Sequence, residues 1–214
     1  MQTPYSMLDE IRTFAGDRAN AVHRIDMETS GLLMASRHKK AERFLKNAFE
    51  SRTIEKSYLA WVDGYIEDPF QVNEALRVRD DYSRDKHKVC ISSEGKKAET
   101  YFEPLEYDPS LDATLLACYP HTGRTHQIRV HLFHVKHPIL GDPIYGASFQ
   151  SANDYLEGVL SEEERMIEMG APRLLLHAQS LKFRYKSKFE LHSRVNFREM
   201  KKMISNKEER KFNS

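Results

Sequence analysis

The sequence predicts an α+β fold in which a mixed, mostly antiparallel central sheet is flanked by helices. Strand-like segments come in consecutive pairs, at 97–107 with 111–119 and at 174–183 with 188–197, as in antiparallel hairpins. Helix-like segments stand between strand-like ones in the order β, α, β, β, β, α, β, β, which is typical of α+β proteins. No Pro- or Gly-rich linker interrupts the chain, so we expect residues 1–214 to form a single domain.

The first third of the chain supplies four expected elements. Residues 3–15 are expected to form a short helix. The apolar run GLLMAS, from Gly31 to Ser36, predicts a buried strand, and the aromatic and β-branched residues of 56–66 predict another. Between them, 38–50 has the spacing of an amphipathic helix. Its apolar face would contain Ala41, Phe44, Leu45, Ala48 and Phe49.

The later elements follow from turn residues and charge. Asp108-Pro109-Ser110 is the expected turn of the first hairpin. The carboxylate-rich stretch 154–168 is expected to be a surface helix. The last residues, 198–214, are highly charged and are expected to form a helix or a frayed tail.

Net charge does not point to a partner, although the charge distribution is uneven. The chain has 33 Lys or Arg and 32 Asp or Glu, so the strongly basic balance of many nucleic-acid-binding proteins is absent. Residues 151–170 contain six acids and one Arg, whereas 181–214 contain eleven Lys or Arg and four Glu. Solvated surface explains both stretches most simply, but an overall balance can also hide a basic face.

Composition excludes several classes of protein. With 40% hydrophobic and 30% charged residues, the chain is not wholly disordered. No apolar run approaches the ~18 residues of a membrane helix, and the start, MQTPYSMLDEIRTF, has no secretory signal. Two cysteines, Cys90 and Cys118, cannot form a disulfide framework. We therefore expect a cytoplasmic protein in which both cysteines pack as ordinary apolar residues.

A first polar segment, VHRIDMETSG at residues 22–31, is a candidate for chemistry. Asp26 could act as a nucleophile or a base if a neighbouring cation keeps it ionised. Alternatively, Asp26 and Thr29 only hydrogen-bond the backbone of a turn that ends at Gly31. Residue types alone favour this second interpretation.

A second polar segment, PHTGRTHQIRVHL at residues 120–132, precedes a predicted helix. Thr125 is its expected N-cap, and its apolar face begins at Ile128. The free N–H groups of a helix start, beside cationic side chains, suit a phosphate, and we favour this function over a merely solvated helix. The polar face would contain Arg124, Gln127 and His131.

Histidines in and after this segment raise the question of a metal. Pairs five residues apart do not share a helix face as the histidines of H-E-x-x-H do, and no acidic residue follows at a ligand-like spacing until Asp142. We therefore expect no metal. The G-x-x-x-x-G-K-[ST], G-x-G-x-x-G and G-x-S-x-G motifs are absent, so we expect no cofactor. The histidines concerned are His121, His126, His131, His134 and His137.

Four separated motifs resemble those of the RluA-type pseudouridine synthases. HRIDMETSGLLMAS is similar to the family's His-Arg-Leu-Asp-x-x-Thr-Ser-Gly motif, with Ile25 in the Leu position. Later motifs of the family are resembled, in the same order, by KSYLAWVDG, by HTGRTHQIRVHL with HPILGDPIYG, and by PRLLLHAQSLKF. Together the matches cover most of 20–185. The resemblance implies the fold of the family's catalytic domain, with a cleft across a largely antiparallel sheet.

The resemblance also implies a reaction, the conversion of uridine to pseudouridine in RNA without a cofactor or metal. Asp26 would be the catalytic residue, kept ionised by Arg129, while Tyr58 would stack on the uracil or take its C5 proton. Because the base lies within folded RNA it must flip out, and Arg24 would fill the vacated space.

Other residues are expected to contact the RNA. Arg124, His126 and Gln127 would meet phosphates, together with basic residues of the tail, and such contacts weaken with salt. The pocket that holds the free base would be walled by Leu174, Leu175 and Leu176, for which core packing is the alternative. The predicted RNA- and substrate-binding set is Arg24, Thr29, Arg124, His126, Gln127, Leu175 and Leu176.

One departure from the family keeps alternatives open. Relatives usually carry two strands and a Lys-Pro-Ser-Gly-like turn before the first motif, and some carry an RNA-binding domain of the S4 type. This chain reaches His23 after twenty-two residues and shows neither, which predicts an exposed sheet edge. A non-catalytic RNA-binding protein is the runner-up, and a histidine-rich metal hydrolase is a third hypothesis. The expected substrate is a stem-loop of ribosomal or transfer RNA, bound by a monomer.

Overall fold

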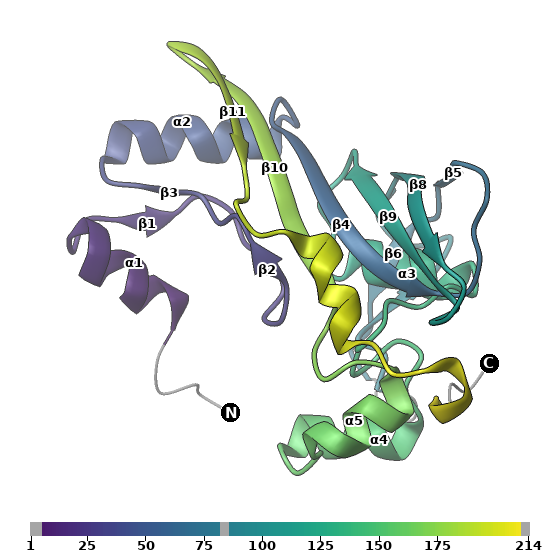
Figure 1. Cartoon of the computed structure of the whole chain (residues 1–214). Coiled ribbons are helices and arrows are strands. Elements are labelled where there is room, and N and C mark those ends of the chain that lie inside the picture. Colours follow the sequence, from purple (N-terminus) through teal and green to yellow (C-terminus); the bar gives the residue numbers. More distant parts are fainter. Residues whose placement is uncertain (1–5, 82–85, 211–214) are drawn as a thin grey trace.

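A central sheet of seven strands organises the molecule (Figure 1). The computed structural model describes residues 6–81 and 86–210. All neighbouring strands of this sheet are antiparallel except β2 (Ser30–Gly31), which runs parallel to β10. The predicted α+β class with a mixed, mostly antiparallel sheet is thus confirmed. The other six strands follow the order β11 (Ser187–His192), β10 (Leu176–Tyr185), β4 (Glu55–Asp63), β9 (Ala113–Pro120), β8 (Thr100–Asp108) and β5 (Phe70–Val72).

The middle of the sheet is the core of the protein. Both predicted hairpins are confirmed, since β8 pairs with β9 and β10 pairs with β11. In β9 only one of eight residues is exposed, as expected for a central strand flanked by β4 and β8. Trp61 of β4 packs with Leu115 and Leu116 of β9 in the largest hydrophobic cluster. By contrast, β11 is the outermost strand on its side, and all its residues are exposed.

The N-terminal part differs from prediction at the run that follows Gly31. Instead of one buried strand over Gly31 to Ser36, the structure has β2 in the central sheet and β3 (Ala35–Ser36) paired with β1 (Asn20–Ala21). The cause is the positive φ of Gly31, +99°, which breaks the extended backbone. Helix α1 (Met7–Ala15) precedes β1, in agreement with prediction over the described residues.

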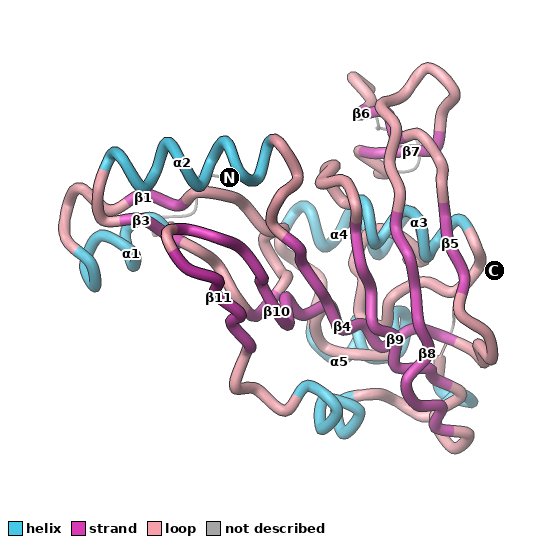
Figure 2. Tube along the Cα trace, turned by 90° about the horizontal axis from the view of Figure 1, so that it is seen from above, coloured by secondary structure: helices cyan, strands magenta, loops and turns pink. Residues whose placement is uncertain are grey.

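Helices α2 (Lys39–Glu50) and α3 (Gln127–His134) lie on one face of the sheet (Figure 2). Leu45 and Ala48 of α2 are buried as predicted, but Phe44 is 44% exposed and contacts Tyr185. The prediction of Thr125 as the N-cap of α3 is wrong. His126 takes that place in the left-handed region, with φ +53°.

The predicted surface helix over 154–168 is two helices. They are α4 (Phe149–Glu157) and α5 (Glu162–Met169), because Gly158 ends the first one in the left-handed region. A separate hairpin of β6 (Leu76–Val78) and β7 (Val89–Ile91) was not predicted, since each strand has only three residues. No helix in the described part of the chain is long and apolar enough to cross a membrane.

The end of the chain is not a frayed tail within the described residues. The 3₁₀ segment η1 (Phe197–Met203) packs on the face of the sheet opposite α2 and α3 (Figure 2), and the exposed segment η2 (Lys207–Glu209) follows it. Phe197 and Ile204 are buried in the main core. Arg210 donates to Asp63 Oδ1 at 2.7 Å, which ties the segment to β4.

Candidate active site

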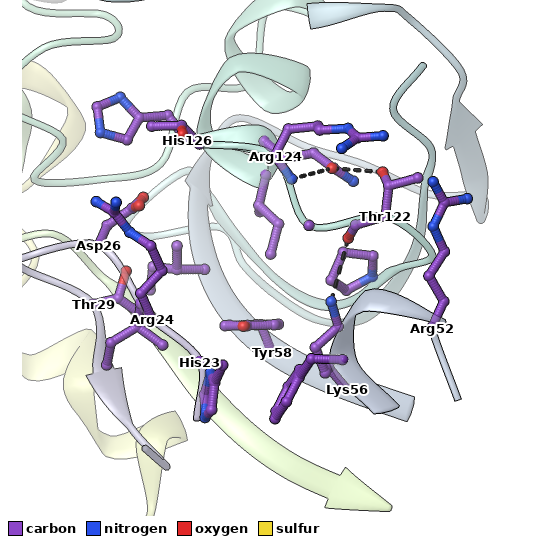
Figure 3. Close-up of a pocket in the computed structure, with 18 of the residues that line it drawn as sticks. His23, Arg24, Asp26, Thr29, Arg52, Lys56, Tyr58, Thr122, Arg124 and His126 are labelled. Atoms are coloured by element: carbon purple, nitrogen blue, oxygen red, sulfur yellow. Dashed lines mark hydrogen bonds between the residues drawn. The ribbon is translucent and has the colours of Figure 1, made fainter. Parts of the chain in front are cut away.

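A cavity of about 660 Å³ opens between the N-terminal part, the start of β4 and the loop that precedes α3 (Figure 3). It brings together residues that are far apart in the sequence. Most of the predicted site residues line it: Arg24, Asp26, Thr29, Tyr58, Arg124, His126, Gln127 and Leu176.

The turn that carries Asp26 is fixed by the strand after it. The Thr29 N–H donates to the Asp26 carbonyl at 3.0 Å, and β2 then pairs with β10. A Cβ on Gly31 would lie 2.3 Å from the Ala178 carbonyl oxygen, so only glycine allows this close approach of β2 to β10. The turn therefore places Asp26 over the cavity.

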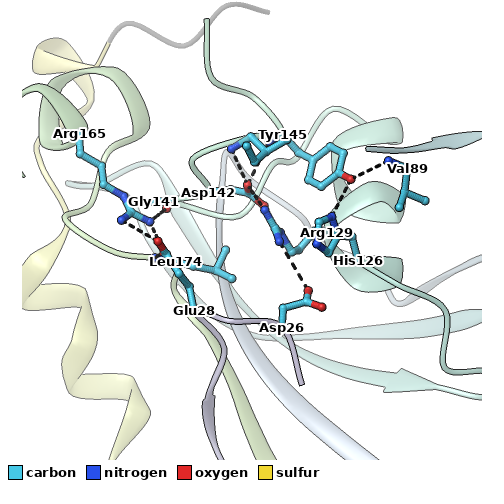
Figure 4. A network of polar contacts seen from close by, with 11 residues as sticks. Asp26, Glu28, Val89, His126, Arg129, Gly141, Asp142, Tyr145, Arg165 and Leu174 are labelled. Carbon is cyan, nitrogen blue, oxygen red and sulfur yellow. Dashed lines mark hydrogen bonds and ion pairs between the residues drawn. The ribbon is translucent and has the colours of Figure 1, made fainter. Parts of the chain in front are cut away.

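A chain of charges holds the Asp26 carboxylate in place (Figure 4). Arg129 Nη1 lies 3.6 Å from Asp26 Oδ2. The other two nitrogens of Arg129, Nε and Nη2, each donate to the carboxylate of Asp142 at 2.7 Å. Arg129 thus presents one free edge of its guanidinium to Asp26, in an orientation that Asp142 sets.

Asp142 was missed by the sequence analysis as a site residue, although it forms the base of this chain. Burial acts to raise the pKa of Asp142, but the Arg129 guanidinium outweighs burial and the pKa lies below its usual range. The backbone N–H groups of Ile144 and Tyr145 also donate to Asp142 Oδ1, at 2.9 and 3.0 Å. The carboxylate is therefore a buried anion with its lone pairs satisfied.

Tyr145 closes the network on the side of α3. Its ring lies under the Arg129 guanidinium at 5.0 Å, and its hydroxyl is 2.8 Å from His126 Nδ1. Burial, followed by the charge of Arg129, lowers the pKa of His126. His126 therefore enters the cavity wall as a neutral ring, which suits hydrogen bonding better than pairing with phosphate charge.

A second arginine, Arg165, binds the same turn through Glu28, which lies two residues after Asp26. Glu28 is bound by both terminal nitrogens of Arg165 from α5 and accepts from the Leu174 N–H at 3.3 Å (Figure 4). Burial opposes ionisation, yet hydrogen bonds from Arg165 and Tyr155 hold the pKa of Glu28 below its usual value. Arg165 also donates to the Gly141 carbonyl at 2.7 Å, next to Asp142. Neither Glu28 nor Arg165 was predicted.

Tyr58 lies in the middle of the cavity, on β4 (Figure 3). Burial, and then the negative charge of Asp26, raises the pKa of Tyr58 to about 12. Its hydroxyl is therefore protonated at neutral pH. This condition suits an aromatic platform better than a proton acceptor.

Two of the predicted contacts prove to be internal. Gln127 is 4% exposed, and its side-chain amide bonds Thr122, the Arg124 N–H and Thr100, so the structure gives it the role of holding the loop rather than meeting phosphate. Leu175 is fully buried in the main core and does not line the cavity, whereas Leu176 does.

Among the other polar side chains at the cavity, Arg24 and Arg124 lie on opposite sides of it, whereas His23 supports its wall. Arg24 is exposed at the cavity on the side of Asp26, and Arg124 lines the opposite side with its Nε bonded to the Lys97 carbonyl at 3.1 Å (Figure 3). His23 is structural, because its Nε2 accepts from the Met34 N–H at 2.9 Å and its ring stacks on Phe49. Burial lowers the pKa of His23 to about 4.

The histidines considered as metal ligands are dispersed. His131 is buried against Thr100, and His137 Nδ1 lies 2.8 Å from the Asp63 carbonyl. Among residues 6–81 and 86–210, no three His, Cys, Asp or Glu side chains form a group that could hold a metal ion.

Comparisons with known proteins show the family to which the chain belongs. The family model described as RNA pseudouridylate synthase matches residues 2–134, a span that includes Asp26, Tyr58 and Arg129. The chain belongs to this family. An uncharacterized RNA pseudouridine synthase of Helicobacter pylori (strain ATCC 700392 / 26695) is 40% identical over 182 residues, which are 85% of this chain. The dual-specificity RNA pseudouridine synthase RluA of Escherichia coli (strain K12) is 39% identical over 77% of this chain.

Solved structures of the family have the same fold. The human RNA pseudouridylate synthase domain containing 1 superposes with a TM-score of 0.72 at 26% identity, over 92% of this chain and 78% of that one. The alignments cover 59% of the H. pylori protein and 66% of the E. coli protein, so the chain spans less than two thirds of either relative.

Proposed function

We propose that this protein isomerises uridine to pseudouridine in RNA. The observation that carries the proposal is the Asp26 carboxylate, held by the Arg129–Asp142 pair at the edge of a 660 Å³ cavity that Tyr58 also lines. Family membership supports the same reaction.

The chemistry begins with a uridine that leaves its stack, at a cost of a few kcal/mol that is lowest in a loop. Arg24, exposed at the mouth of the cavity, would take the place of the base. The uracil would lie on the ring of Tyr58 and against Leu176, both of which line the cavity.

Asp26 then acts at the ribose, as a nucleophile on the anomeric carbon or as a base on a ribose proton. The C–N glycosidic bond breaks and the detached uracil turns within the cavity. A C–C bond forms between uracil C5 and the anomeric carbon, C5 loses its proton, and N1 gains one, so the product is an isomer of the substrate. The raised pKa of Tyr58 favours stacking as its role, and leaves the C5 proton to another base.

A stem-loop of ribosomal or transfer RNA is the proposed substrate. One relative is named a ribosomal large subunit pseudouridine synthase, which supports ribosomal RNA, and another is named a dual-specificity RNA pseudouridine synthase. The proposed setting is the cytoplasm. Its reducing conditions suit the two free thiols, Cys90 and Cys118.

The test maps pseudouridine by carbodiimide-dependent reverse-transcription stops in RNA from cells with and without the gene. We expect at least one site to disappear without the gene, and to return with the wild-type gene but not with Asp26→Ala. Return of the site with Asp26→Ala would refute the role of Asp26. Loss of no site would favour the alternative, a non-catalytic RNA-binding protein.

A further inference from the structure

Cations gather on the side of the cavity that faces away from Asp26. Arg52, Lys56 and Arg124 lie around the loop that contains Gly123, while Asp26 lies across the cavity (Figure 3). Within residues 6–81 and 86–210, no Asp or Glu forms an ion pair with any of the three. They differ in this respect from Lys46 at the same cavity, which pairs with Glu42 at 2.8 Å.

Lys56 is a partly buried cation whose charge is disfavoured by its surroundings. Its ammonium donates to the Thr122 carbonyl at 3.3 Å and to no other acceptor in the described part of the chain. Burial, and then the positive charge of Arg52, lowers the pKa of Lys56. Both effects disfavour the charged form of Lys56, and an anion bound beside it would favour that form.

The loop beside Lys56 is shaped in advance. The side-chain oxygen Oε1 of Gln127 accepts from the Thr122 hydroxyl at 2.6 Å and from the Arg124 N–H at 3.0 Å, so both sides of Gly123 are held. A Cβ on Gly123 would lie 3.4 Å from Lys56 Nζ and would narrow the space around the ammonium. The absence of a side chain therefore leaves the ammonium open to a ligand.

Arg52 reaches the same place from a strained backbone. It follows α2 in the left-handed region, with φ +60°, a conformation that costs free energy for any residue except glycine. The conformation sets the direction in which the chain leaves α2 and enters β4. It brings an exposed guanidinium close to the Lys56 ammonium.

The spacing along β4 relates this cluster to the reacting base. Lys56 and Tyr58 are two residues apart in one strand, so they point to the same face about 7 Å apart. If Tyr58 carries the flipped uracil, Lys56 lies within reach of the backbone of an adjoining nucleotide.

We propose that Lys56 and Arg52, beside Gly123, bind a backbone phosphate of the nucleotide next to the target uridine. The proposal rests on the proposed function, because RNA supplies the anion. As a consequence, the RNA strand would lie across the cavity in a fixed direction. One end of the cavity would receive the target base, and the other end would hold the neighbouring phosphate.

The test measures binding of an RNA stem-loop with uridines in its loop, by fluorescence anisotropy over a series of KCl concentrations. Lys56→Gln and Arg52→Gln should each reduce the slope of log K against log salt, by at most about 0.7 to 0.9, the value for one lost phosphate contact. The matched control is Lys40→Gln, an exposed lysine of α2 that does not line the cavity and should leave the slope unchanged. Because Arg52 is exposed, its variant decides the test if Lys56→Gln does not fold.

Pseudouridine formation is measured with the same proteins, so that the two proposals can fail separately. Wild-type turnover with unchanged slopes in Arg52→Gln and Lys56→Gln would overturn the phosphate site and leave the proposed function standing. Reduced slopes in a protein that modifies no RNA would support the phosphate site and refute the proposed function. An equal fall in Lys40→Gln would also overturn the site, since the effect would then be general.

Discussion

At the scale of single residues, the candidate site depends on a carboxylate that does not face the substrate. Asp142 has a side chain that is 1% exposed, and it contacts two of the three guanidinium nitrogens of Arg129. Its role is to position Arg129, which in turn meets Asp26 with the remaining nitrogen. The charge of Asp142 should therefore matter to the reaction although it is buried behind the site.

We predict that Asp142→Asn lowers the rate of pseudouridine formation about 100-fold, the scale of loss when a reacting group is misplaced by about 1 Å. The amide keeps the size of the side chain but cannot accept both guanidinium hydrogen bonds, so Arg129 is free to swing toward Asp26. Single-turnover kinetics would measure the rate, and anisotropy would show RNA binding retained. Asp112→Asn is the control, because Asp112 pairs with Lys207 in the C-terminal segment. A wild-type rate in Asp142→Asn would contradict the positioning role.

The sequence could identify Asp26, Tyr58 and Arg129 because each stands within a short motif. Asp142 also stands within a matched segment, HPILGDPIYG, but the residue order does not show that its carboxylate binds Arg129, because that contact is made only in three dimensions. Leu175 was misplaced for a similar reason. Leu174 and Leu175 precede β10 and Leu176 begins it, and a run of three leucines does not tell which of them faces the cavity and which faces the core.

At the scale of elements, α4 and α5 support the turn that carries Asp26. The sequence contains the signals for both helices: Ser161 and Glu164 form a capping box, and Gly158 and Gly170 end the two helices. What it lacks is any sign that Arg165 reaches Glu28, 137 residues earlier. The short strands β5, β6 and β7 were missed because three residues are too few to show a period of two.

We predict that Arg165→Met reduces kcat while the KM for RNA stays near the wild-type value, because the loosened turn misplaces Asp26 without removing an RNA contact. It should also destabilise the fold by roughly 3 kcal/mol, the lower end for breaking a buried ion pair, since Glu28 loses its partner. Arg165→Lys should restore only part of kcat, because lysine cannot bind a carboxylate with two nitrogens. Steady-state kinetics and denaturant unfolding would measure both effects. Equal losses in kcat at Glu163→Gln, an exposed neighbour on α5, would argue against this role of Arg165.

At the scale of the whole molecule, the cations differ in whether they form ion pairs within the protein, which the balanced net charge does not reveal. Several basic residues of the C-terminal segment form ion pairs within the protein: Lys201 pairs with Glu106 and Asp108, and Arg210 with Asp63. Arg24, Arg52, Lys56 and Arg124 form no ion pair with the described residues, and all four line the cavity. These four cations therefore place positive charge at the cavity in a chain whose net charge is close to zero.

Buried neutral histidines give the whole fold a dependence on pH. Burial lowers the pKa of His23, His126, His131 and His177, so the unfolded chain takes up protons before the folded one does. Stability from such groups is fully present above the ordinary histidine pKa of 6.5 and is lost as pH falls. For His23 the loss extends from pH 6.5 to about 4, since its folded pKa is about 4.

We predict that the melting temperature falls steadily across this window, and that His23→Gln makes the fall shallower. Glutamine can still accept from the Met34 N–H but has no proton to gain, so the variant removes the titration and keeps a hydrogen bond. Differential scanning calorimetry at a series of pH values would measure both curves at equal ionic strength. If the two proteins lost stability in parallel, His23 would not be a neutral buried ring, and the stacking on Phe49 would belong to an imidazolium.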